Sequence, residues 1–530
     1  MLFTSYEFIG FLLLLFLLYY TLPKKLQWQL LLVFNYVFYF FANPWYLVYI
    51  IITTVTVYLL GCRIEKLRSE QSQYLKQHKE DLNREEKKAY KNGIKKRQWK
   101  LLLAALFINL GILVVVKYSN FVISNINTIL HAAGGAKELS FLNLLLPMGI
   151  SFYTFQAVGY IIDVYRGTSS AEKNLFKFAL FVSFFPQLIQ GPISRFNDLS
   201  RTLYEEHPFA WEKMSRGLQR ILWGFFKKLV IADRILTGVN EIVRNPEEYV
   251  GAYVFVGMMF YALELYADFT GGIDITIGVA QCLGIKVTEN FNRPYFSKSI
   301  KEYWRRWHIT MGTWFTDYIF YPISVCKPML KLSKFSRKYF GETIGKRIPV
   351  YLSSFAVWLA TGIWHGASWN FVVWGLGNWI VIMISQELEP LYRKFHNRFP
   401  VEGNDIFRLF QVVRTILLMS CLRTFDCYRN VLLTFQMLGT MFTARNWSVL
   451  WDGSLLKLGL SGTDYAILAA GMMLLILVSL MQRTGSVREK IARKPYVLRF
   501  AIWYGLFLAV LIMGAYGIGY DVSQFIYNQF

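Results

Sequence analysis

Residues 101–116 read LLLAALFINLGILVVV, a run without a charged side chain. Similar apolar runs occur at 8–20 (FIGFLLLLFLLYY), 464–480 (DYAILAAGMMLLILVSL) and 500–520 (FAIWYGLFLAVLIMGAYGIGY). A helix needs about 20 mostly apolar residues to cross a bilayer. Of the 530 residues, 55% are hydrophobic and only 17% are charged, whereas a soluble protein carries about 25% charged residues. The sequence therefore predicts an all-α, polytopic membrane protein.

The net charge of +23 is concentrated in loops beside apolar runs. Residues 63–100 hold 13 Lys/Arg against 6 Asp/Glu, and residues 482–499 hold 6 against 1. The positive-inside bias and anionic inner-leaflet lipids produce such loops. We therefore predict membrane lipids, and no nucleic acid, as partners of these charges. Both loops are expected in the cytoplasm, which places the N-terminus and the C-terminus outside a multi-pass bacterial cell membrane.

Several common catalytic signatures are absent from the sequence. It contains no GxxxxGK[ST] loop, no HExxH and no GxSxG elbow. Its five cysteines show no metal-ligand spacing, so we predict no metal site. The sequence therefore lacks the motifs that usually indicate nucleotide hydrolysis, metalloproteolysis or serine-hydrolase chemistry.

The stretch 286–324 combines many aromatic residues with many charged ones. Charges facing hydrocarbon are costly, so this stretch is expected to be re-entrant or to line a wet cavity. Residues 299–302 (SIKE) fit a capping box that would start a helix. Trp304 and His308, four residues apart, would then share one face of that helix.

Two of the six histidines lie in aromatic sequence at membrane depth. They are His308, in WRRWHITMGTWF, and His365, in LATGIWHGASWNFVVWG. A titratable side chain there is a functional candidate, and the alternative is a buried histidine bonded to a backbone carbonyl. Gly362 and Gly366 beside His365 would leave room for a substrate to approach the imidazole. The other four are interpreted as solvated: His78, His131, His207 and His396.

Four blocks of the chain, taken in order, resemble the membrane-bound O-acyltransferase superfamily. The blocks are LPMGISFYTFQAVGYIIDVYRG (146–167), FPQLIQGPISRF (185–196), ENFNRPYFSKSIKEYWRRWHITMGTWFTDYIFYPI (289–323) and TGIWHGASWNFVVWG (361–375). The pairing of WRRWH with WHG is highly specific. The resemblance runs from about residue 100 to 480. It is strongest to the bacterial branch of alginate O-acetyltransferase membrane subunits and teichoic acid D-alanine transferases.

The resemblance implies a fold, a donor and a set of site residues. The fold is a ring of tilted and re-entrant helices around a thinned central tunnel, and the acetyl donor is acetyl-coenzyme A, with no permanently bound cofactor. His365 matches the family's nearly invariant histidine and is cast as the general base. His308 matches the second essential histidine. Asn290, Trp304 and Trp364 are assigned to substrate binding.

Three regions of the chain follow from this interpretation. Residues 1–99 would form N-terminal spans and a basic loop, residues 100–481 the acyltransferase core, and residues 482–530 a basic loop, a final span and an extracellular tail. The basic clusters around Arg216, Arg220, Lys227 and Lys228, and in 327–347, are candidates for steering the phosphates of the donor, or are ordinary cytoplasmic loops.

The chain ends in FIYNQF (525–530), an F-x-Y-x-x-F pattern around Tyr527. It resembles the C-terminal motif of the small single-span protein that accompanies teichoic acid D-alanine transferases. That resemblance implies an acyl group carried on the Tyr527 phenol, which is a better leaving group than a sugar hydroxyl. The alternative is a tyrosine of the interfacial aromatic belt.

The favoured function is O-acetylation of an extracellular or cell-wall polysaccharide. The expected partner is an extracytoplasmic acetyltransferase of the SGNH-hydrolase type, or the polysaccharide itself. Two alternatives remain open from the sequence. One is D-alanyl or other acyl transfer to a teichoic-acid-like polymer, and the other is a transporter for a lipid-linked sugar.

Overall fold

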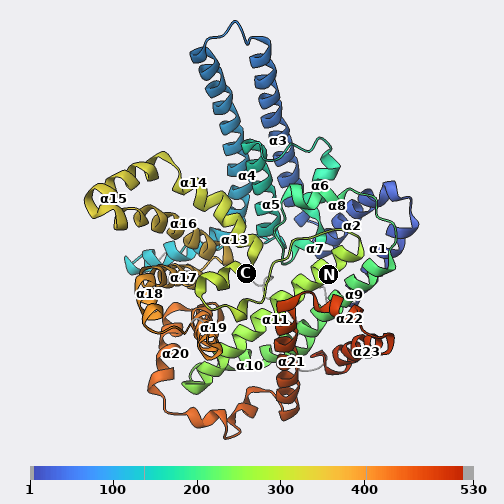
Figure 1. Cartoon of the computed structure of the whole chain (residues 1–530), viewed down its shortest axis with the longest axis vertical. Coiled ribbons are helices and arrows are strands. Elements are labelled where there is room, and N and C mark those ends of the chain that lie inside the picture. The colour runs from blue at the N-terminus through green and yellow to red at the C-terminus, as the bar shows by residue number, and fades with distance from the viewer. Residues whose placement is uncertain (1–4, 136–137, 402, 517–530) are drawn as a thin grey trace. The chain divides into compact units, whose positions relative to one another are not determined.

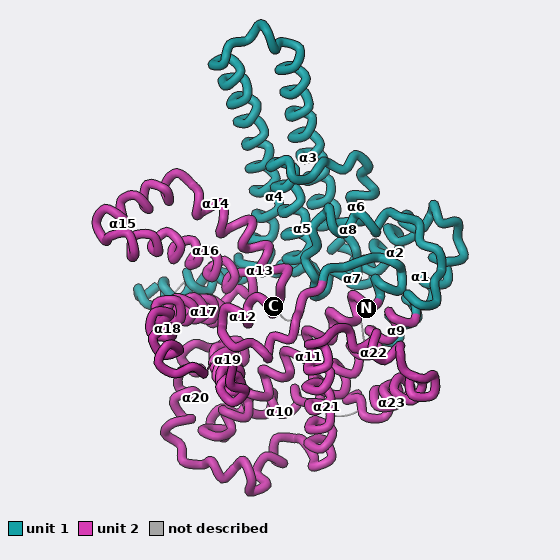
Figure 2. Tube along the Cα trace, in the orientation of Figure 1, with its two compact units in different colours: residues 1–214, 279–288 teal, residues 215–278, 289–530 magenta. Residues whose placement is uncertain are grey.

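The computed structural model describes residues 5–135, 138–401 and 403–516, which form helices joined by turns and loops (Figure 1). The chain divides into two compact units, residues 1–214 with 279–288 and residues 215–278 with 289–530 (Figure 2). The boundary between the units falls inside two helices, α9 (Trp211–Phe225) and α11 (Ala252–Cys282). The three-part division expected from the sequence remains a prediction.

Unit 1 is built from the N-terminal helices. Eight described α-helices lie wholly within it, and the predicted apolar runs 8–20 and 101–116 fall in the first and the fourth of them. These are α1 (Tyr6–Thr21), α2 (Gln27–Ala42), α3 (Tyr46–Gln77), α4 (Arg84–Ala132), α5 (Ile150–Arg166), α6 (Leu175–Ser183), α7 (Phe185–Leu188) and α8 (Phe196–Leu203).

The basic stretch 63–100 is a helical hairpin and not the loop that the sequence predicted. Helix α3 continues to Gln77 and α4 begins at Arg84, so only a short turn separates them (Figure 1). The side chain of Asn83 accepts hydrogen bonds from the backbone N–H of Glu85 and Glu86, and Glu86 accepts one from the backbone N–H of Asn83. This closed capping box starts α4 directly after the turn.

The close packing at the start of α5 explains why residue 149 of unit 1 is a glycine. Gly149, which precedes α5, has a φ of +72°, and a Cβ at this position would lie 2.1 Å from the carbonyl oxygen of Leu188 in α7. A residue with a side chain would meet both a backbone clash and an unfavourable conformation. After α7, helical structure resumes only at Phe196, so residues 189–195 interrupt the helices as the Gly191-Pro192 pair predicts.

Unit 2 begins within α9 and includes most of α11, and it carries the histidine motifs. Two of its segments, Phe226–Ala232 and Thr316–Phe320, are π-helical. The longer α-helices that follow the motif around His308 are α15 (Lys327–Gly345), α16 (Arg347–His365), α17 (Trp369–Glu387), α18 (Glu389–Arg398), α19 (Asp405–Tyr428) and α20 (Val431–Thr443). The other elements are α10 (Asp233–Arg244), α12 (Ile300–Arg306), α13 (Ile309–Phe315), α14 (Tyr321–Ser324), α21 (Gly462–Met481), α22 (Val487–Ala492) and α23 (Tyr496–Met513).

Five described helices are long and apolar enough to cross a membrane: α3, α4, α11, α21 with the turn after it, and α23. A sixth span results if α17 and α18, bent by 47°, are taken together. Helices α1 and α20 are apolar but shorter. The stretch 286–324 forms a 3₁₀ turn, the short helix α12 and a helical run over 309–324 that joins α13 to α14 through a π-helical segment, and its re-entrant or cavity-lining position stays a prediction. The chain is a polytopic helical membrane protein.

Candidate active site

The segment that carries His308 is a break between two short helices in unit 2. The side chain of Ser299 accepts a hydrogen bond from the backbone N–H of Glu302, 3.2 Å away, and α12 begins at Ile300. This helix start agrees with the predicted N-cap at Ser299. The capping box is not closed, because the Glu302 carboxylate accepts from the backbone N–H of Lys298 and not from that of Ser299. Helix α12 ends at Arg306, and His308 precedes α13 with a φ of +49°.

The helical break corrects one expectation. Trp304 and His308 do not share a helix face, because the chain leaves the helix between them. A left-handed conformation is uncommon for a residue other than glycine and costs free energy that the surroundings must offset. His308 is fully buried, so the surrounding packing can hold it in that conformation.

Asn290 holds His308 and the start of α13 together. Its side-chain oxygen accepts hydrogen bonds from the backbone N–H and the hydroxyl of Thr310, at 3.1 Å and 2.9 Å. The same oxygen lies 3.3 Å from Nδ1 of His308. Its backbone carbonyl accepts from the backbone N–H of Ile309, 2.9 Å away. Asn290, like His308, is fully buried.

These contacts assign the tautomer of His308. The backbone N–H of Thr310 can only donate, so it fixes the Asn290 oxygen as the acceptor at this position. His308 must then donate from Nδ1 to that oxygen, which places the lone pair of the neutral imidazole on Nε2. A nitrogen in this state can accept a proton. His308 is therefore chemically suited to be a second base as well as a positioning group.

His365 is the last residue of α16 and is 5% exposed. Its imidazole contacts the indole of Trp374 in α17, with ring centroids 4.7 Å apart. The indole of Trp364 contacts both candidate imidazoles: its ring centroid lies 5.9 Å from that of His308 and 5.0 Å from that of His365. Trp364 thus joins the two histidine motifs, which are far apart in sequence, within unit 2.

The glycines beside His365 serve helix packing, contrary to the expectation that they leave room for a substrate. A Cβ on Gly362 would lie 2.5 Å from the carbonyl oxygen of Phe371, and one on Gly366 would lie 2.1 Å from the Phe371 ring. Gly375 in α17 faces α16 just as closely, with a Cβ position 2.5 Å from the carbonyl oxygen of Trp358. These glycines let α16 and α17 approach closely, which fixes His365 at the end of α16.

Arg423 in α19 is a buried member of this site that the sequence reasoning did not identify. It is 4% exposed. Its guanidinium lies over three indoles, 4.7 Å from the centroid of Trp374, 5.3 Å from Trp307 and 5.7 Å from Trp304. Asp426, at 3.5 Å, is its ion-pair partner. The signal in the sequence was an Arg and an Asp three residues apart within the otherwise apolar run of α19.

Trp304 takes part in the packing of this cluster. Its indole N–H donates to the side-chain oxygen of Asn378, 3.2 Å away, and its ring packs edge-on against Trp358 and Trp374. The side chain is only half-buried. The assignment of Trp304 to substrate binding stays a prediction, and the contacts that the structure describes are structural ones.

Three of the four cations around Arg220 that were proposed to steer a donor are internally paired. Lys228 bonds with Asp233 and Asp268, at 2.8 Å and 2.6 Å. Lys227 and Arg220 share the carboxylate of Asp274, at 2.6 Å and 2.8 Å, and Lys227 and Lys228 are both buried. Neutralised, buried cations contribute little to long-range steering. Arg216 is the more exposed member, with Glu489 at 3.9 Å.

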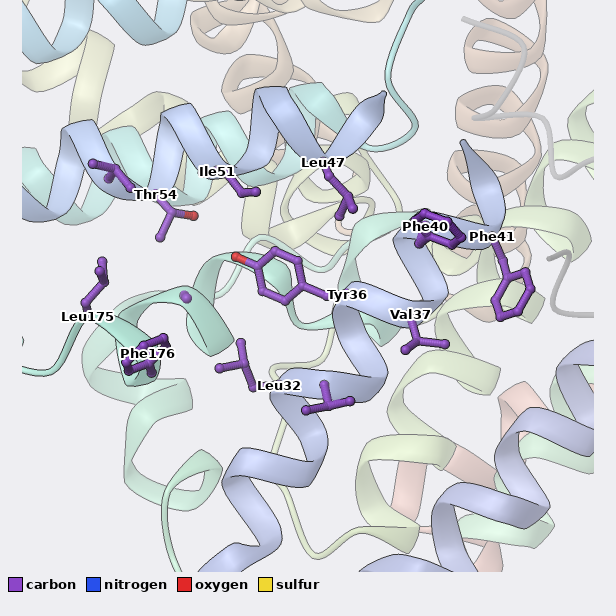
Figure 3. Close-up of a pocket in the computed structure, with 13 residues that line it drawn as sticks. Leu32, Tyr36, Val37, Phe40, Phe41, Leu47, Ile51, Thr54, Leu175 and Phe176 are labelled. Atoms are coloured by element: carbon purple, nitrogen blue, oxygen red, sulfur yellow. The ribbon is translucent and has the colours of Figure 1, made fainter. Parts of the chain in front are cut away.

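An apolar cavity lies within unit 1. It has a volume of about 830 Å³ and lies between α2, α3 and the start of α6 (Figure 3). Leu32, Phe40, Ile51 and Phe176 are among the apolar side chains that line it. Among the described residues, no three His, Cys, Asp or Glu side chains converge on a possible metal position. Tyr527 lies outside the residues that the structure describes.

The site places two buried histidines in a polytopic helical membrane protein, and sequence comparison identifies the family. Residues 169–424 match the family model for MBOAT, the membrane-bound O-acyltransferase family. The chain belongs to the membrane-bound O-acyltransferase family and is an O-acyltransferase. His308, His365 and Arg423 all lie within the matched residues.

Three relatives illustrate the range of the family. The chain is 34% identical over 387 residues to a probable alginate O-acetylase, AlgI, of Azotobacter vinelandii, covering 72% of this chain and 68% of the relative. It is 29% identical to a peptidoglycan O-acetyltransferase of Helicobacter pylori, covering 58% of each chain. It is also 29% identical to a teichoic acid D-alanyltransferase of Bacillus subtilis, covering 48% of this chain and 62% of the relative.

Proposed function

We propose that this protein transfers acetyl groups from cytoplasmic acetyl-coenzyme A, across the membrane, for O-acetylation of an extracellular or cell-wall polysaccharide. The observation that carries the proposal is the pair of buried imidazoles, His308 and His365, joined through the indole of Trp364. The relatives named above as an alginate O-acetylase and a peptidoglycan O-acetyltransferase support acetyl as the group and polysaccharide as the acceptor.

In the first step the phenol oxygen of Tyr527 attacks the thioester carbonyl. His365 accepts the phenolic proton as the new C–O bond forms. When the tetrahedral intermediate collapses, the C–S bond breaks and the thiolate takes the proton back, which releases coenzyme A as the free thiol. The product is an acetyl ester on Tyr527. Splitting the transfer into two steps is the usual gain of covalent catalysis.

In the second step an acceptor hydroxyl attacks the aryl ester. The C–O bond to Tyr527 breaks, the acetyl group moves to the acceptor oxygen, and the proton lost by the acceptor returns to the phenol. The acceptor is a sugar hydroxyl of the polymer or the nucleophile of an extracytoplasmic acetyltransferase of the SGNH-hydrolase type. In this scheme both termini of the chain lie on the extracytoplasmic side of the membrane.

His308 and Asn290 position the reacting groups in this account. Nε2 of His308 carries the lone pair and so accepts a hydrogen bond from an incoming hydroxyl, while Asn290 fixes the ring through Nδ1. Such fixed orientation within a buried site lowers the entropic part of the barrier. Trp364, which contacts both imidazoles, is proposed to line the path of the acyl group.

The D-alanyl alternative is favoured by one observation, the identity to a teichoic acid D-alanyltransferase. The transporter alternative is set aside, because the family consists of acyltransferases. A donor competition separates the two acyl groups. Purified protein is given radiolabelled acetyl-coenzyme A and, separately, a radiolabelled D-alanyl carrier-protein thioester. Transfer from the first alone supports the proposal, and transfer from the second alone overturns it.

A further inference from the structure

A small polar pocket in unit 2 lies next to Asn290 in the chain. It has a volume of about 100 Å³ and is lined by residues of α9, α11, the loop 289–293 and the end of α21. That volume admits roughly three water molecules, at about 30 Å³ each, or one compact polar group, and it is far too small for a nucleoside. Its size and polarity are those of a subsite for part of a larger ligand.

The inner wall of the pocket is a neutralised ion network. Arg220 donates from both terminal nitrogens to the two carboxylate oxygens of Glu289, at 2.5 Å and 2.6 Å, and from Nε to Asp274, at 2.8 Å. Lys227 donates to the same Asp274, at 2.6 Å, and to the Thr270 hydroxyl, at 2.8 Å. Two cations and two carboxylates balance each other here, and their geometry is fixed by bidentate pairing.

The mouth of the pocket carries a surplus of positive charge. Arg293 lines it and Arg483 lies close to Arg293, whereas the described residues place no carboxylate in ion-pair contact with either. Burial, followed by the neighbouring guanidinium groups of Arg306 and Arg483, lowers the pKa of Arg293. Arg306 differs, because it pairs with Glu302 at 2.5 Å. The carboxylate that acts on Arg293 is that of Glu302, which already pairs with Arg306, so the three guanidinium groups keep a net positive charge that favours an anionic ligand.

The backbone holds Arg293 at this mouth. Its φ is +49°, an uncommon conformation for arginine, and it is followed by Pro294 in a short 3₁₀ turn. The guanidinium of Arg306 donates to the Arg293 carbonyl, 3.4 Å away, and the backbone N–H of Asn292 donates to the Arg306 carbonyl, 2.9 Å away. A strained residue kept in place by several bonds is a mark of a built site.

Two aromatic rings in series separate the pocket from His308. Phe291 lines the pocket, and its ring contacts Phe269 with centroids 4.9 Å apart. The ring of Phe269 in turn contacts the imidazole of His308, 5.0 Å away. Aromatic side chains therefore separate a group bound in the pocket from His308. The rest of the ligand, which is covalently attached to that group, would reach past these side chains.

We propose that this pocket is the subsite for a phosphate group of the acyl donor, with Arg293, which lines it, as the ligand, Arg483 as a neighbouring cation and Arg220 as the fixed cation of its inner wall. The inference deepens the proposed function, on which it rests for the identity of the donor. Guanidinium groups bind phosphate oxygens in bidentate fashion, so arginine suits this task better than lysine. The positive charge of Arg293 and Arg483 then faces the negative charge of the bound phosphate.

The test compares binding of coenzyme A, without any acyl transfer, to the purified full chain in phosphatidylcholine nanodiscs. Arg293→Gln and Arg483→Gln, singly and together, are measured against Arg445→Gln, which removes the same charge from an exposed position between α20 and the next 3₁₀ turn. The double variant is expected to raise the Kd about tenfold or more, because hydrogen bonds to charged groups are each worth about 1.5–3 kcal/mol. Inorganic pyrophosphate should compete with coenzyme A in the wild type.

Two outcomes overturn the assignment. One is a Kd for the double variant equal to that of Arg445→Gln. The other is unchanged coenzyme A binding together with weakened binding of phosphatidylglycerol vesicles, which would make the phosphate that of a lipid. Turnover separates this inference from the proposed function. If the variants weaken binding but the wild type transfers no acetyl group, the subsite stands and the proposed function fails. If transfer proceeds with an unaltered KM in the double variant, the subsite fails and the function stands.

Discussion

The side-chain oxygen of Asn290 lies 3.3 Å from Nδ1 of His308 and also caps the first turn of α13 through Thr310. One buried amide therefore sets both the ring orientation of His308 and the point where the helix after it begins. The two roles explain why the chain can break at Trp307 and still hold the imidazole in a single place.

Replacing Asn290 by Ala should lower kcat about a hundredfold while the KM changes little, because a misplaced catalytic group loses rate more than binding. The matched control is Asn292→Ala, two residues later, whose side chain is exposed. Steady-state kinetics of acetyl transfer give kcat and KM for the two variants. Equal activity of the two variants would remove Asn290 from the site.

Replacing Gly362 by Ala should destabilise the protein by about 1–3 kcal/mol, the usual cost of overpacking. The added Cβ would meet the Phe371 carbonyl oxygen at 2.5 Å, which the α16–α17 pair cannot absorb without moving. Gly439→Ala in α20 is the control, since no atom lies within 4 Å of its Cβ position. Thermal unfolding in detergent should lower the Tm of the first variant only. An unchanged Tm for Gly362→Ala would contradict the packing role.

Replacing Arg423 by Lys keeps the charge but removes the planar group that lies over Trp304, Trp307 and Trp374. A desolvated cation–π contact is worth about 2 kcal/mol, so both the Tm and the rate of acetyl transfer should fall. Arg408→Lys, a change on the same helix at a half-exposed arginine that pairs with Asp405, should leave both unaltered. If Arg423→Lys matches Arg408→Lys, the cation–aromatic cluster does not organise the site.

Incubation with acetyl-coenzyme A should add one acetyl group to the peptide that contains Tyr527. Peptide mass spectrometry detects the modification, and Tyr527→Phe should lack both the modification and transfer to the acceptor. Tyr516→Phe, which removes a hydroxyl that donates to the Val510 carbonyl, serves as the control and should stay active. Full transfer by Tyr527→Phe would exclude the acyl-tyrosine step.

Apolar length and charge placement were enough to predict the membrane helices, because both depend on local sequence. They misjudged residues 63–100, where a charged but strongly capped hairpin extends the helices beyond the bilayer-length segments. The break at His308 followed from tertiary contacts of Asn290, which no local pattern contains. The glycines beside His365 were misinterpreted for the same reason, since their partner, Phe371, comes from the next helix.

Arg423 shows what sequence reasoning needs for a site of this kind. Sequence alone does not separate Arg423 from the more exposed Arg408 and Arg414 of the same helix, and its three indole partners come from two other segments of the chain. The candidate histidines could be chosen from local sequence because a titratable group at membrane depth is unusual in itself. Their connection through Trp364 required the structure.

The most direct test of the account is the rate at which His365→Ala transfers radiolabelled acetyl from acetyl-coenzyme A, with His396→Ala as the control for a histidine outside the site. Loss of a general base typically costs about a hundredfold or more, so we predict near-complete loss for His365→Ala at normal expression and Tm, and wild-type transfer for His396→Ala. Transfer by His365→Ala at more than about a tenth of the wild-type rate would contradict its assignment as the base.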